Sequence, residues 1–352
     1  MKKYIGKSTV AIAVATALLA LPAHADKVLL KTPVAIGTHL PALGTPMKWV
    51  SKQLPVASGG SVKMKVYEPG KLVAANEILD AVSTGKVNAG YTTAGYWKGK
   101  IPAAPLFSAV PFGPEAPEYM AWLYFGNGNK LYQEMYDQAG YNVKVLPCAI
   151  NSPETSGWFA KPINKPEDLK GLNMRFFGFG AQIMEKLGVS TVQLPGGEIF
   201  GALEKGAIDA TEFSQPAVDQ RLGFHKIVKY NYFPGWHQQS TVWELLINKD
   251  TWNKMDANQQ GAVETVCMAS MTYSMAEGES LQYDAMLKAK ESGVKQLYWS
   301  QDMLDLFENT WLDVVEEQKK DPFFNKVWAD LTQFRANYKV WSDKAFLPRT
   351  GE

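Results

Sequence analysis

The sequence predicts an α/β protein whose two lobes enclose a hinged cleft. Strand-like and helix-like segments alternate through residues 28–91 and again through residues 157–213, and each alternation is typical of a mainly parallel sheet covered by helices. The chain of 352 residues is also longer than one hydrophobic core usually serves. Two extended segments, 229–233 and 241–248, follow the second alternation and are expected to cross between the lobes.

The N-terminus has the pattern of a secretory signal peptide over residues 1–25. Lys2, Lys3 and Lys7 precede an apolar run, and a small-residue cleavage motif ends at Ala25. The run is too short to span a bilayer comfortably, and an uncleaved anchor is the alternative. No cysteine stands at the cleavage point to carry a lipid. We therefore expect an exported protein of the periplasm.

The mature chain is expected to be nearly neutral. The sequence holds 36 lysines and arginines against 35 aspartates and glutamates, and loss of the three signal lysines leaves 33 against 35. Such a balance gives no indication of a nucleic-acid partner or of an acidic membrane surface.

The chain contains two cysteines, Cys148 and Cys267, which lie far apart in the sequence. An export compartment permits a disulfide. Two buried thiols also fit the sequence, and they are the favoured interpretation. The sequence contains neither a C-x-x-C pair nor the ligand spacing of a zinc site.

The first lobe is expected to span residues 26–150, together with part of 215–260. Gly85 follows a short amphipathic segment and is the usual left-handed end of a helix. Residues 38–43 lie between the first strand and the first helix, at the edge where open α/β sheets bind ligands. The strands are expected at 28–36, 62–67 and 87–91, and the helices at 42–54 and 76–84.

The second lobe is expected to have its core within residues 151–240. Gly188 and Gly206 each follow a helical pattern and are expected to end it. The strands are expected at 157–161, 172–176, 192–194 and 210–213, the helices at 180–187 and 197–205, and a turn with a short helix at 166–171.

The last third of the chain is expected to be helical. Residues 252–290 have a nearly continuous helical pattern with room for one break, and further helices are expected at 303–319 and 323–338. Ser300 is the expected N-cap of the middle helix. The apolar stripe of that helix is expected to face the core and consists of Leu304, Phe307, Trp311 and Val314.

Two motifs of the second lobe resemble signatures of a known family. Residues 168–175 read D-L-K-G-L-N-M-R, and residues 203–210 read L-E-K-G-A-I-D-A. Both are similar to motifs in the periplasmic solute-binding proteins of tripartite ATP-independent periplasmic (TRAP) transporters, and the resemblance covers nearly the whole mature chain. Three further segments resemble the subgroup that binds 2-oxo acids and lactate with a metal ion, namely residues 196–200, 212–213 and 232–237.

The resemblance implies a two-lobed, type II-like binding-protein fold with hinge strands. It also implies a long helix, within residues 250–300, that bridges both lobes. The implied task is to capture a small organic acid and deliver it to a membrane permease of two subunits. In this subgroup an extended C-terminal helix can be exchanged between chains, so the helical extension at 301–352 is the expected dimerisation element.

The resemblance places the ligand carboxylate on Arg175. A guanidinium group matches a carboxylate with two parallel hydrogen bonds. The alternative is a structural arginine paired within the lobe. The resemblance also assigns Tyr96 as a hydroxyl donor to the carboxylate. Thr155 stands where relatives use asparagine to bind the 2-oxo or 2-hydroxy oxygen, and its shorter hydroxyl leaves the choice of acid open.

A bound cation is the second expectation from the resemblance. Glu212 and the backbone carbonyl of Phe213 occupy positions of metal ligands. Glu154 stands where relatives have glutamine, and its extra negative charge favours Ca²⁺ over Na⁺. The alternative for Glu154 is an exposed acid in a loop. Gln238 or Gln239 can supply a further oxygen, and Gln239 is preferred.

The apolar wall of the site is expected from Phe177, Phe213 and Trp236, although core packing explains each of them equally well. The histidines are scattered, and no serine, cysteine or histidine arrangement suggests a nucleophile with its base. We therefore expect a receptor for a 2-oxo or 2-hydroxy monocarboxylate rather than an enzyme. The alternatives are an exported metal-assisted lyase or hydrolase that acts on an oxo acid, and a C4-dicarboxylate-binding protein.

Overall fold

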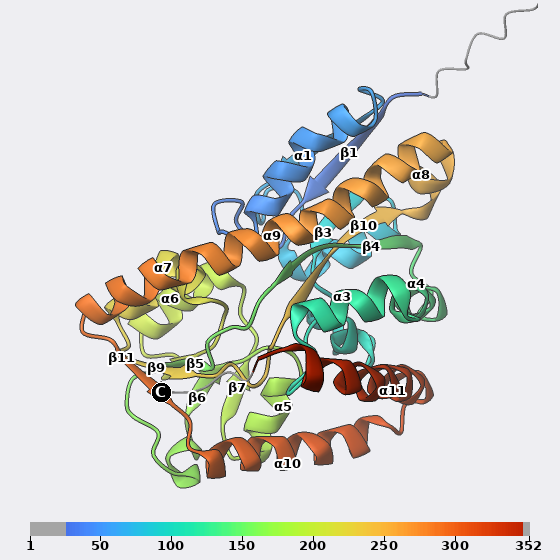
Figure 1. The fold of residues 1–352 in the computed structure, drawn as a ribbon. Coiled ribbons are helices and arrows are strands. Elements are labelled where there is room, and N and C mark those ends of the chain that lie inside the picture. The colour runs from blue at the N-terminus through green and yellow to red at the C-terminus, as the bar shows by residue number, and fades with distance from the viewer. Residues whose placement is uncertain (1–25, 348–352) are drawn as a thin grey trace, which may run out of the picture.

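The computed structural model describes residues 26–347, and it contains two α/β lobes that share one long helix (Figure 1). The predicted signal peptide falls on residues 1–25, which lie outside the described residues. Between residues 26 and 347, no helix combines the length and the apolar character that crossing a bilayer requires.

The first lobe contains eight α-helices and β-strands before the chain leaves it. They are β1 (Val28–Pro33), α1 (Thr45–Ala57), β2 (Val62–Tyr67), α2 (Ile78–Ser83), β3 (Ala89–Thr92), α3 (Ala116–Phe125), α4 (Gly128–Gln138) and β4 (Val143–Asn151). α3 and α4 have no counterpart among the predicted elements. A ninth element, β10 (Thr241–Asn248), returns from the second lobe.

The strands of the first lobe form a parallel pair and an antiparallel sheet. β1 and β2 are parallel, and an isolated bridge between Val34 and Tyr91 connects β1 to β3. β10 lies between β3 and β4 and is antiparallel to both. The prediction of a mainly parallel sheet is therefore wrong for this lobe. The reason is that β4 and β10 belong to segments that cross between the lobes in opposite directions.

The backbone of this lobe corrects the predicted start of one helix and confirms the predicted end of another. α1 begins at Thr45 rather than at residue 42, because Ala42 has a φ of 59°, which lies outside the helical region. The Ala42 amide instead donates to Thr45 Oγ1 at 3.1 Å. Gly85 has a φ of 76°, and this confirms the predicted left-handed residue after α2.

The second lobe has a six-stranded sheet with the order β11-β9-β5-β8-β6-β7. Its elements are β5 (Gly157–Phe159), β6 (Asn173–Arg175), α5 (Gly178–Lys186), β7 (Ser190–Val192), α6 (Gly196–Glu204), β8 (Ala210–Thr211), α7 (Pro216–Leu222), β9 (Tyr230–Phe233) and β11 (Lys295–Tyr298). β6 is parallel to β7 and to β8, so the carboxyl ends of these strands meet at one edge. Gly188 and Gly206 follow α5 and α6 with φ values of 91° and 68°, as predicted.

The lobes are joined by two strands and by the long helix α9 (Ala257–Glu291). β4 leaves the first lobe and β10 returns to it, while α9 packs against α1 and β4 on one side and against α7 on the other (Figure 1). At Gly278 the helix approaches both lobes. A Cβ there would lie 2.9 Å from Gln215 Oε1 and 3.4 Å from Ala42 Cβ. The predicted break is also present, because α8 (Lys249–Lys254) ends before α9 begins.

Two further helices, α10 (Gln301–Gln318) and α11 (Pro322–Ala345), complete the chain and contact both lobes. α10 packs on α5, and α11 packs on α3 and α4. Ser300 Oγ accepts a hydrogen bond from the Met303 amide at 3.3 Å, which confirms the predicted N-cap. In the predicted stripe of α10, Leu304 is partly buried and the other three side chains are fully buried.

Cys148 in β4 and Cys267 in α9 form a disulfide, so the interpretation of the two cysteines as thiols is wrong. Both residues are buried, and their Cα atoms lie 4.2 Å apart. The bond connects the lobe-bridging helix to a crossing strand. Only the packing of α9 on β4 reveals the pairing, because 119 positions separate the cysteines in the sequence.

Glu244 is a fully buried carboxyl group of β10 that is surrounded by hydrogen-bond donors. Its oxygens accept bonds from Tyr132 Oη at 2.5 Å, from Tyr136 Oη at 2.8 Å and 2.9 Å, and from Trp97 Nε1 at 3.2 Å. Burial outweighs these donors and raises the pKa of Glu244 to about 7. The folded protein therefore keeps a proton that the unfolded chain releases at lower pH.

We expect the free energy of unfolding to fall as the pH rises from 4.5 to about 7. The contribution of Glu244 is complete below its ordinary pKa and is lost as the pH rises through its folded pKa, an effect on the order of 3 kcal/mol. Glu244→Gln has no proton to lose, so its unfolding free energy should depend less steeply on pH. Urea unfolding between pH 5 and 8 with chelator measures both slopes, and the surface variant Glu77→Gln is the control. Equal slopes for Glu244→Gln and wild type would contradict this assignment.

Candidate functional site

Arg175 and Glu212 form a buried ion pair at the carboxyl ends of two neighbouring strands. Arg175 ends β6 and Glu212 follows β8, so the parallel register brings them together. Arg175 Nη1 lies 2.6 Å from Glu212 Oε1 and donates to the Glu212 carbonyl oxygen at 2.8 Å. The two side chains are 2% and 0% exposed. This is the pairing within the lobe that the structural alternative for Arg175 describes, and it lies at the carboxyl ends of β6 and β8.

Glu154 belongs to the segment that connects β4 to β5, and it is buried rather than exposed in a loop. Its Oε1 accepts hydrogen bonds from Asn151 Nδ2 at 2.9 Å and from Thr241 Oγ1 at 3.3 Å. Its Oε2 is buried and has no hydrogen-bond partner among the described residues. Gly235 packs directly on this segment, where any Cβ would overlap the Glu154 carbonyl.

His237 is a candidate ligand residue that sequence reasoning missed. Its Nε2 lies 3.5 Å from Glu212 Oε2, and its ring is buried. Glu154, Glu212 and His237 each offer one metal-ligating atom, and these atoms all lie within 4.8 Å of one another. In the sequence, His237 is the last residue of the segment 232–237, which resembles the subgroup that binds its ligand with a metal ion. We call Arg175, Glu154, Glu212 and His237 the charged cluster.

The two glutamates of the charged cluster have opposite pKa shifts, although burial disfavours the ionised form of both. At Glu212, Arg175 and His237 outweigh burial and lower the pKa. At Glu154, burial and the charge of Glu212 raise the pKa well above 4.5, and the hydrogen bond from Asn151 only partly offsets them. Glu212 is therefore the more acidic member of the pair.

The atoms of the charged cluster fit a metal cation. Several buried polar atoms here have no hydrogen-bond partner among the described residues, namely Glu154 Oε2, Glu212 Oε2, His237 Nδ1 and Nε2, and Gln238 Oε1. Buried polar atoms are costly unless an ion, water or ligand satisfies them. Two carboxylates and an amide oxygen are ligands that a hard divalent cation such as Ca²⁺ prefers. Cation binding would also favour the deprotonated form of Glu154.

Tyr96 belongs to the first lobe and meets the second lobe at Phe177. The two ring centroids are 5.3 Å apart, with an interplanar angle of 84°. A Cβ on Gly95 would overlap the Phe177 ring, so a glycine is needed for this approach. Burial raises the pKa of Tyr96, and the positive charge of Arg175 partly opposes this shift. The Tyr96 hydroxyl therefore lies close enough to the charged cluster to interact with it electrostatically.

Phe213 packs against the guanidinium group of Arg175. The guanidinium carbon lies 5.1 Å from the centroid of the Phe213 ring, a distance at which cation–π attraction contributes. The Phe213 ring is also packed against Gly196, where a Cβ would lie 2.5 Å from it. Phe177 and Phe213 are both nearly buried, at 6% and 7% exposure. The structure therefore brings these two predicted wall residues next to Tyr96 and Arg175.

Thr155 is buried close to the charged cluster, but its hydroxyl contacts Asp219 of α7. Thr155 Oγ1 lies 3.3 Å from Asp219 Oδ2, and Trp158 Nε1 donates to the same oxygen at 2.8 Å. Burial, with a further contribution from Glu212, raises the pKa of Asp219 to about 7. Asp219 is a second residue that sequence reasoning missed, and it positions Thr155 rather than facing the cluster itself.

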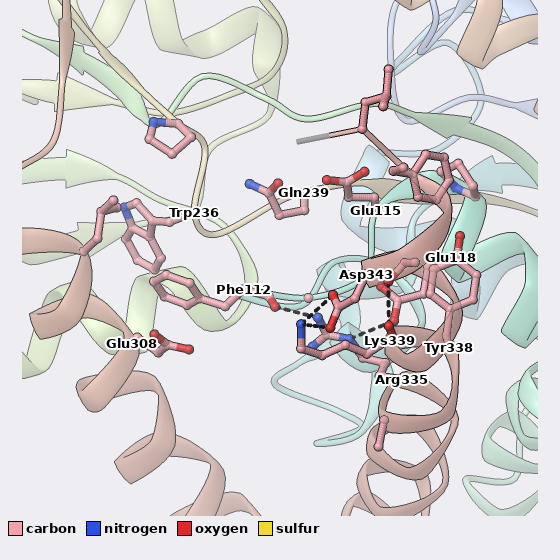
Figure 2. Close-up of a pocket in the computed structure, with 18 residues that line it drawn as sticks. Phe112, Glu115, Glu118, Trp236, Gln239, Glu308, Arg335, Tyr338, Lys339 and Asp343 are labelled. Carbon is pink, nitrogen blue, oxygen red and sulfur yellow. Dashed lines mark hydrogen bonds and ion pairs between the residues drawn. The ribbon is translucent and has the colours of Figure 1, made fainter. Parts of the chain in front are cut away.

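The side chains of Trp236 and Gln239 line a cavity of about 970 Å³ beside α11 (Figure 2). The Trp236 ring stacks on Phe307 of α10 with centroids 4.6 Å apart, so core packing explains it. Gln239 Nε2 donates to the Gly235 carbonyl at 2.8 Å. Arg175, Glu154 and Glu212 do not line this cavity. The volume of a cavity therefore does not by itself identify the candidate ligand site.

Gln238, rather than the preferred Gln239, is connected to the charged cluster. Gln238 Nε2 donates to Thr241 Oγ1 at 2.7 Å, and the same hydroxyl lies 3.3 Å from Glu154 Oε1. The Gln238 side chain is 4% exposed. No sequence pattern distinguished the two glutamines.

Comparison with known proteins supports this interpretation of the fold. The family model of bacterial extracellular solute-binding protein family 7 (DctP) matches residues 43–321. A monocarboxylate 2-oxoacid-binding periplasmic protein of Nostoc sp. PCC 7120 is 34% identical over 311 residues, which are 88% of this chain and 84% of the relative.

Solved structures of TRAP solute-binding proteins have the same fold. The protein of Bordetella bronchiseptica RB50 has a TM-score of 0.88 and 27% identity, over 91% of this chain and 95% of that chain. It is a mixed-occupancy dimer with copurified calcium and picolinate in one site and an apo second site. The protein of Pseudoalteromonas atlantica T6c, with bound sodium and pyruvate, has a TM-score of 0.85 and 30% identity, over 91% and 97%.

A third structure, from Colwellia psychrerythraea, contains calcium and pyruvate and has a TM-score of 0.86 at 29% identity, over 91% of this chain and 98% of that chain. These matches confirm the predicted two-lobed binding-protein fold. Members of the family bind solutes outside the cytoplasm and are not enzymes. With the family model covering most of its length, the chain belongs to family 7 of the bacterial extracellular solute-binding proteins.

Proposed function

We propose that this chain is the periplasmic receptor of a TRAP transporter and that it binds a 2-oxo or 2-hydroxy monocarboxylate together with a divalent cation. The observation that carries the proposal is the charged cluster, in which a buried arginine lies beside two buried carboxyl groups with unsatisfied oxygens. The pyruvate bound in the Pseudoalteromonas and Colwellia structures supports the class of acid.

Charge balance supports a divalent cation. One ionised monocarboxylate with Glu154 and Glu212 brings three negative charges into a buried site. Arg175 and a divalent ion bring three positive charges. Buried charges are tolerated when they are paired in this way. A monovalent ion would leave one negative charge uncompensated unless Glu154 kept its proton.

In this proposal Arg175 binds the acid carboxylate, and Tyr96 of the first lobe donates its hydroxyl to the same group. Thr155 lies near the 2-oxo or 2-hydroxy oxygen, while Phe177 and Phe213 exclude water. Glu154 and Glu212 hold the cation, with the Phe213 carbonyl and Gln238 as further oxygens. Because the acid contacts both lobes, it favours the closed conformation, and that conformation is what the permease recognises.

We also propose that the C-terminal extension docks on a second copy of the chain. Four large apolar side chains near the end of α11 are more than 60% exposed, and exposed apolar groups of this kind mark interaction surfaces. They are Val340, Trp341, Phe346 and Leu347. Sedimentation that gave only monomer at micromolar concentration would reject this part of the proposal.

The test of the function is a thermal-unfolding experiment on the mature protein with pyruvate, lactate and longer 2-oxo acids. We expect an acid to raise the midpoint in Ca²⁺ and to have little effect with chelator, since a ligand at about 100 times its Kd stabilises the native state by ~2.7 kcal/mol. Proton NMR of the same mixtures should show the acid unchanged. Absence of any shift, or formation of a product, would overturn the proposal.

Glu154→Gln tests the role of the extra carboxylate. Removal of one negative charge should weaken Ca²⁺ binding by about tenfold or more and should allow Na⁺ to support acid binding, because fewer negative charges then need to be balanced. Calorimetric titration of Ca²⁺ and of pyruvate in each cation measures the change. Glu308→Gln, at the cavity of Figure 2, is the matched control. Unchanged Ca²⁺ affinity in Glu154→Gln would remove Glu154 from the proposed site.

A further inference from the structure

His237 brings a nitrogen atom into a cluster whose other candidate ligand atoms are oxygens. Its Nε2 lies 3.5 Å from Glu212 Oε2, which is longer than an ordinary hydrogen bond, and neither atom has a hydrogen-bond partner among the described residues. Glu154 offers a third ligand atom, and all three side chains are at most 4% exposed. Two atoms bound to one ion at about 2.1 Å and at a tetrahedral angle are about 3.4 Å apart, so the spacing of Nε2 and Oε2 suits a shared ion.

The imidazole ring of His237 is held by aromatic packing rather than by hydrogen bonds. The ring centroid of Phe176 lies 5.0 Å away, and that of Trp236 lies 5.5 Å away, each with an interplanar angle of 69°. Gly180 of α5 is a third neighbour, where an added Cβ would lie 3.2 Å from His237 Cβ. Neither ring nitrogen has a hydrogen-bond partner among the described residues. Packing therefore orients the ring and leaves the lone pair of Nε2 free for an ion.

An imidazole nitrogen changes the class of cation that the cluster suits. Ca²⁺ takes about six to eight ligands, and they are oxygens. Imidazole suits Zn²⁺ and Ni²⁺, and the affinity of a mixed nitrogen and oxygen site rises from Mn²⁺ to Zn²⁺. Two carboxylates and one imidazole, with positions left for oxygens of a bound acid, match the three protein ligands of open zinc sites. A nitrogen ligand would distinguish this chain from the relatives whose structures contain calcium or sodium.

We propose that His237 is a ligand of the cation and that it makes the charged cluster select a first-row transition dication over Ca²⁺, with Zn²⁺ bound more tightly than Mn²⁺. The inference rests on the proposed function, because this cation is the one that accompanies the acid. Glu154 and Glu212 supply the charge that balances the ion, and the unprotonated Nε2 supplies the atom that distinguishes between ions. Ca²⁺ still binds, since the two carboxylates hold it without His237.

The experiment is a titration of the metal-free mature protein with Zn²⁺, Mn²⁺ and Ca²⁺, without acid and with the free ion concentration set by a competing chelator. We expect Zn²⁺ to bind at least about 100-fold more tightly than Ca²⁺, with Mn²⁺ between them. His237→Gln replaces the nitrogen with an amide oxygen. It should weaken Zn²⁺ binding by at least about 30-fold, since loss of a group that only supports a ligand already costs ~10–100-fold. The affinity for Ca²⁺ should stay within about threefold of wild type.

His225→Gln is the matched control, because His225 is a partly buried histidine outside the charged cluster. It should keep the wild-type order of affinities, which separates His237 from adventitious Zn²⁺ binding at other histidines. Proton NMR of the Co²⁺-loaded protein gives a readout that does not depend on affinity. A strongly shifted imidazole N–H signal is expected in wild type and in His225→Gln, and it should be lost in His237→Gln. A role of His237 in packing alone would not produce this signal.

The outcomes separate this inference from the proposed function. Wild-type protein that binds Ca²⁺ as tightly as Zn²⁺, and that binds a 2-oxo acid in Ca²⁺, would overturn the inference and leave the receptor function intact. The same Zn²⁺ affinity in His237→Gln and in His225→Gln would also overturn the inference alone. Failure of all three ions and of every acid to bind, with folded protein confirmed by circular dichroism, would overturn both.

Discussion

Replacing Arg175 with alanine is expected to weaken binding of a 2-oxo acid by at least about 30-fold, because truncating one member of a buried charge pair typically costs about 2–5 kcal/mol. The Arg175 side chain is 2% exposed and pairs with Glu212. Its loss would leave the acid carboxylate without its cationic partner in a buried site. The measurement is a calorimetric titration with pyruvate in Ca²⁺.

Two further variants separate binding from folding. Arg175→Ala also leaves Glu212 buried without its partner, and this can destabilise the fold by about 3–5 kcal/mol. Arg175→Lys keeps the positive charge but loses the planar fork, so it should fold more stably and still bind the acid clearly more weakly than wild type. Arg335→Ala removes a half-buried arginine that pairs with Glu118 on α3, outside the cluster, and is the control. Wild-type affinity in Arg175→Ala would disprove the carboxylate assignment.

Removing the disulfide is expected to have the largest effect on stability. In the chain-entropy description, a cross-link that encloses about 100 residues contributes about 4.7 kcal/mol, and measured losses for native disulfides are commonly ~2–5 kcal/mol. The bond joins Cys148 of β4 to Cys267 of α9, so its loss also frees the bridging helix from a crossing strand. Cys148→Ala/Cys267→Ala should therefore unfold at a clearly lower denaturant concentration, and its melting midpoint should fall by about 5 °C or more.

Reduction provides an independent control for that variant. Wild-type protein that has been unfolded and refolded in dithiothreitol should approach the midpoint of the double alanine variant, whereas the variant itself should not respond to dithiothreitol. Acid affinity at 25 °C should change little, since neither cysteine contacts the charged cluster. A midpoint that is the same in wild type with and without reductant would show that the bond does not stabilise the protein.

In the second lobe, local sequence patterns predicted most of the helices and strands. Its strands are short, but the glycines that follow α5 and α6 have the left-handed backbone that their positions predict. The strands predicted at 172–176 and 210–213 correspond to β6 and β8, and the structure shows that these two are parallel partners. Local periodicity and turn residues were sufficient here because each element is determined within about ten residues of chain.

The first lobe shows where local patterns fail. α3 and α4 have no predicted counterpart, and β10 is antiparallel to strands that were expected to lie in a parallel sheet. The direction of β10 depends on the lobe from which the chain returns, which is a property of the connection and not of the strand sequence. The choice of Gln238 over Gln239 also depends on tertiary contacts, because Gln238 Nε2 donates to Thr241 Oγ1 whereas Gln239 Nε2 donates to the Gly235 carbonyl.

By itself the sequence determined the class of fold, the family motifs, most elements of the second lobe and the identity of Arg175, Glu212 and Glu154 as candidates. The tertiary structure alone decided that His237 joins them, that Trp236 packs elsewhere and that the two cysteines are bonded. The physical reason is the distance along the chain between the residues that meet in the site. Elements form through interactions between near neighbours, whereas a buried site collects atoms from distant segments, and their meeting depends on strand order and helix packing.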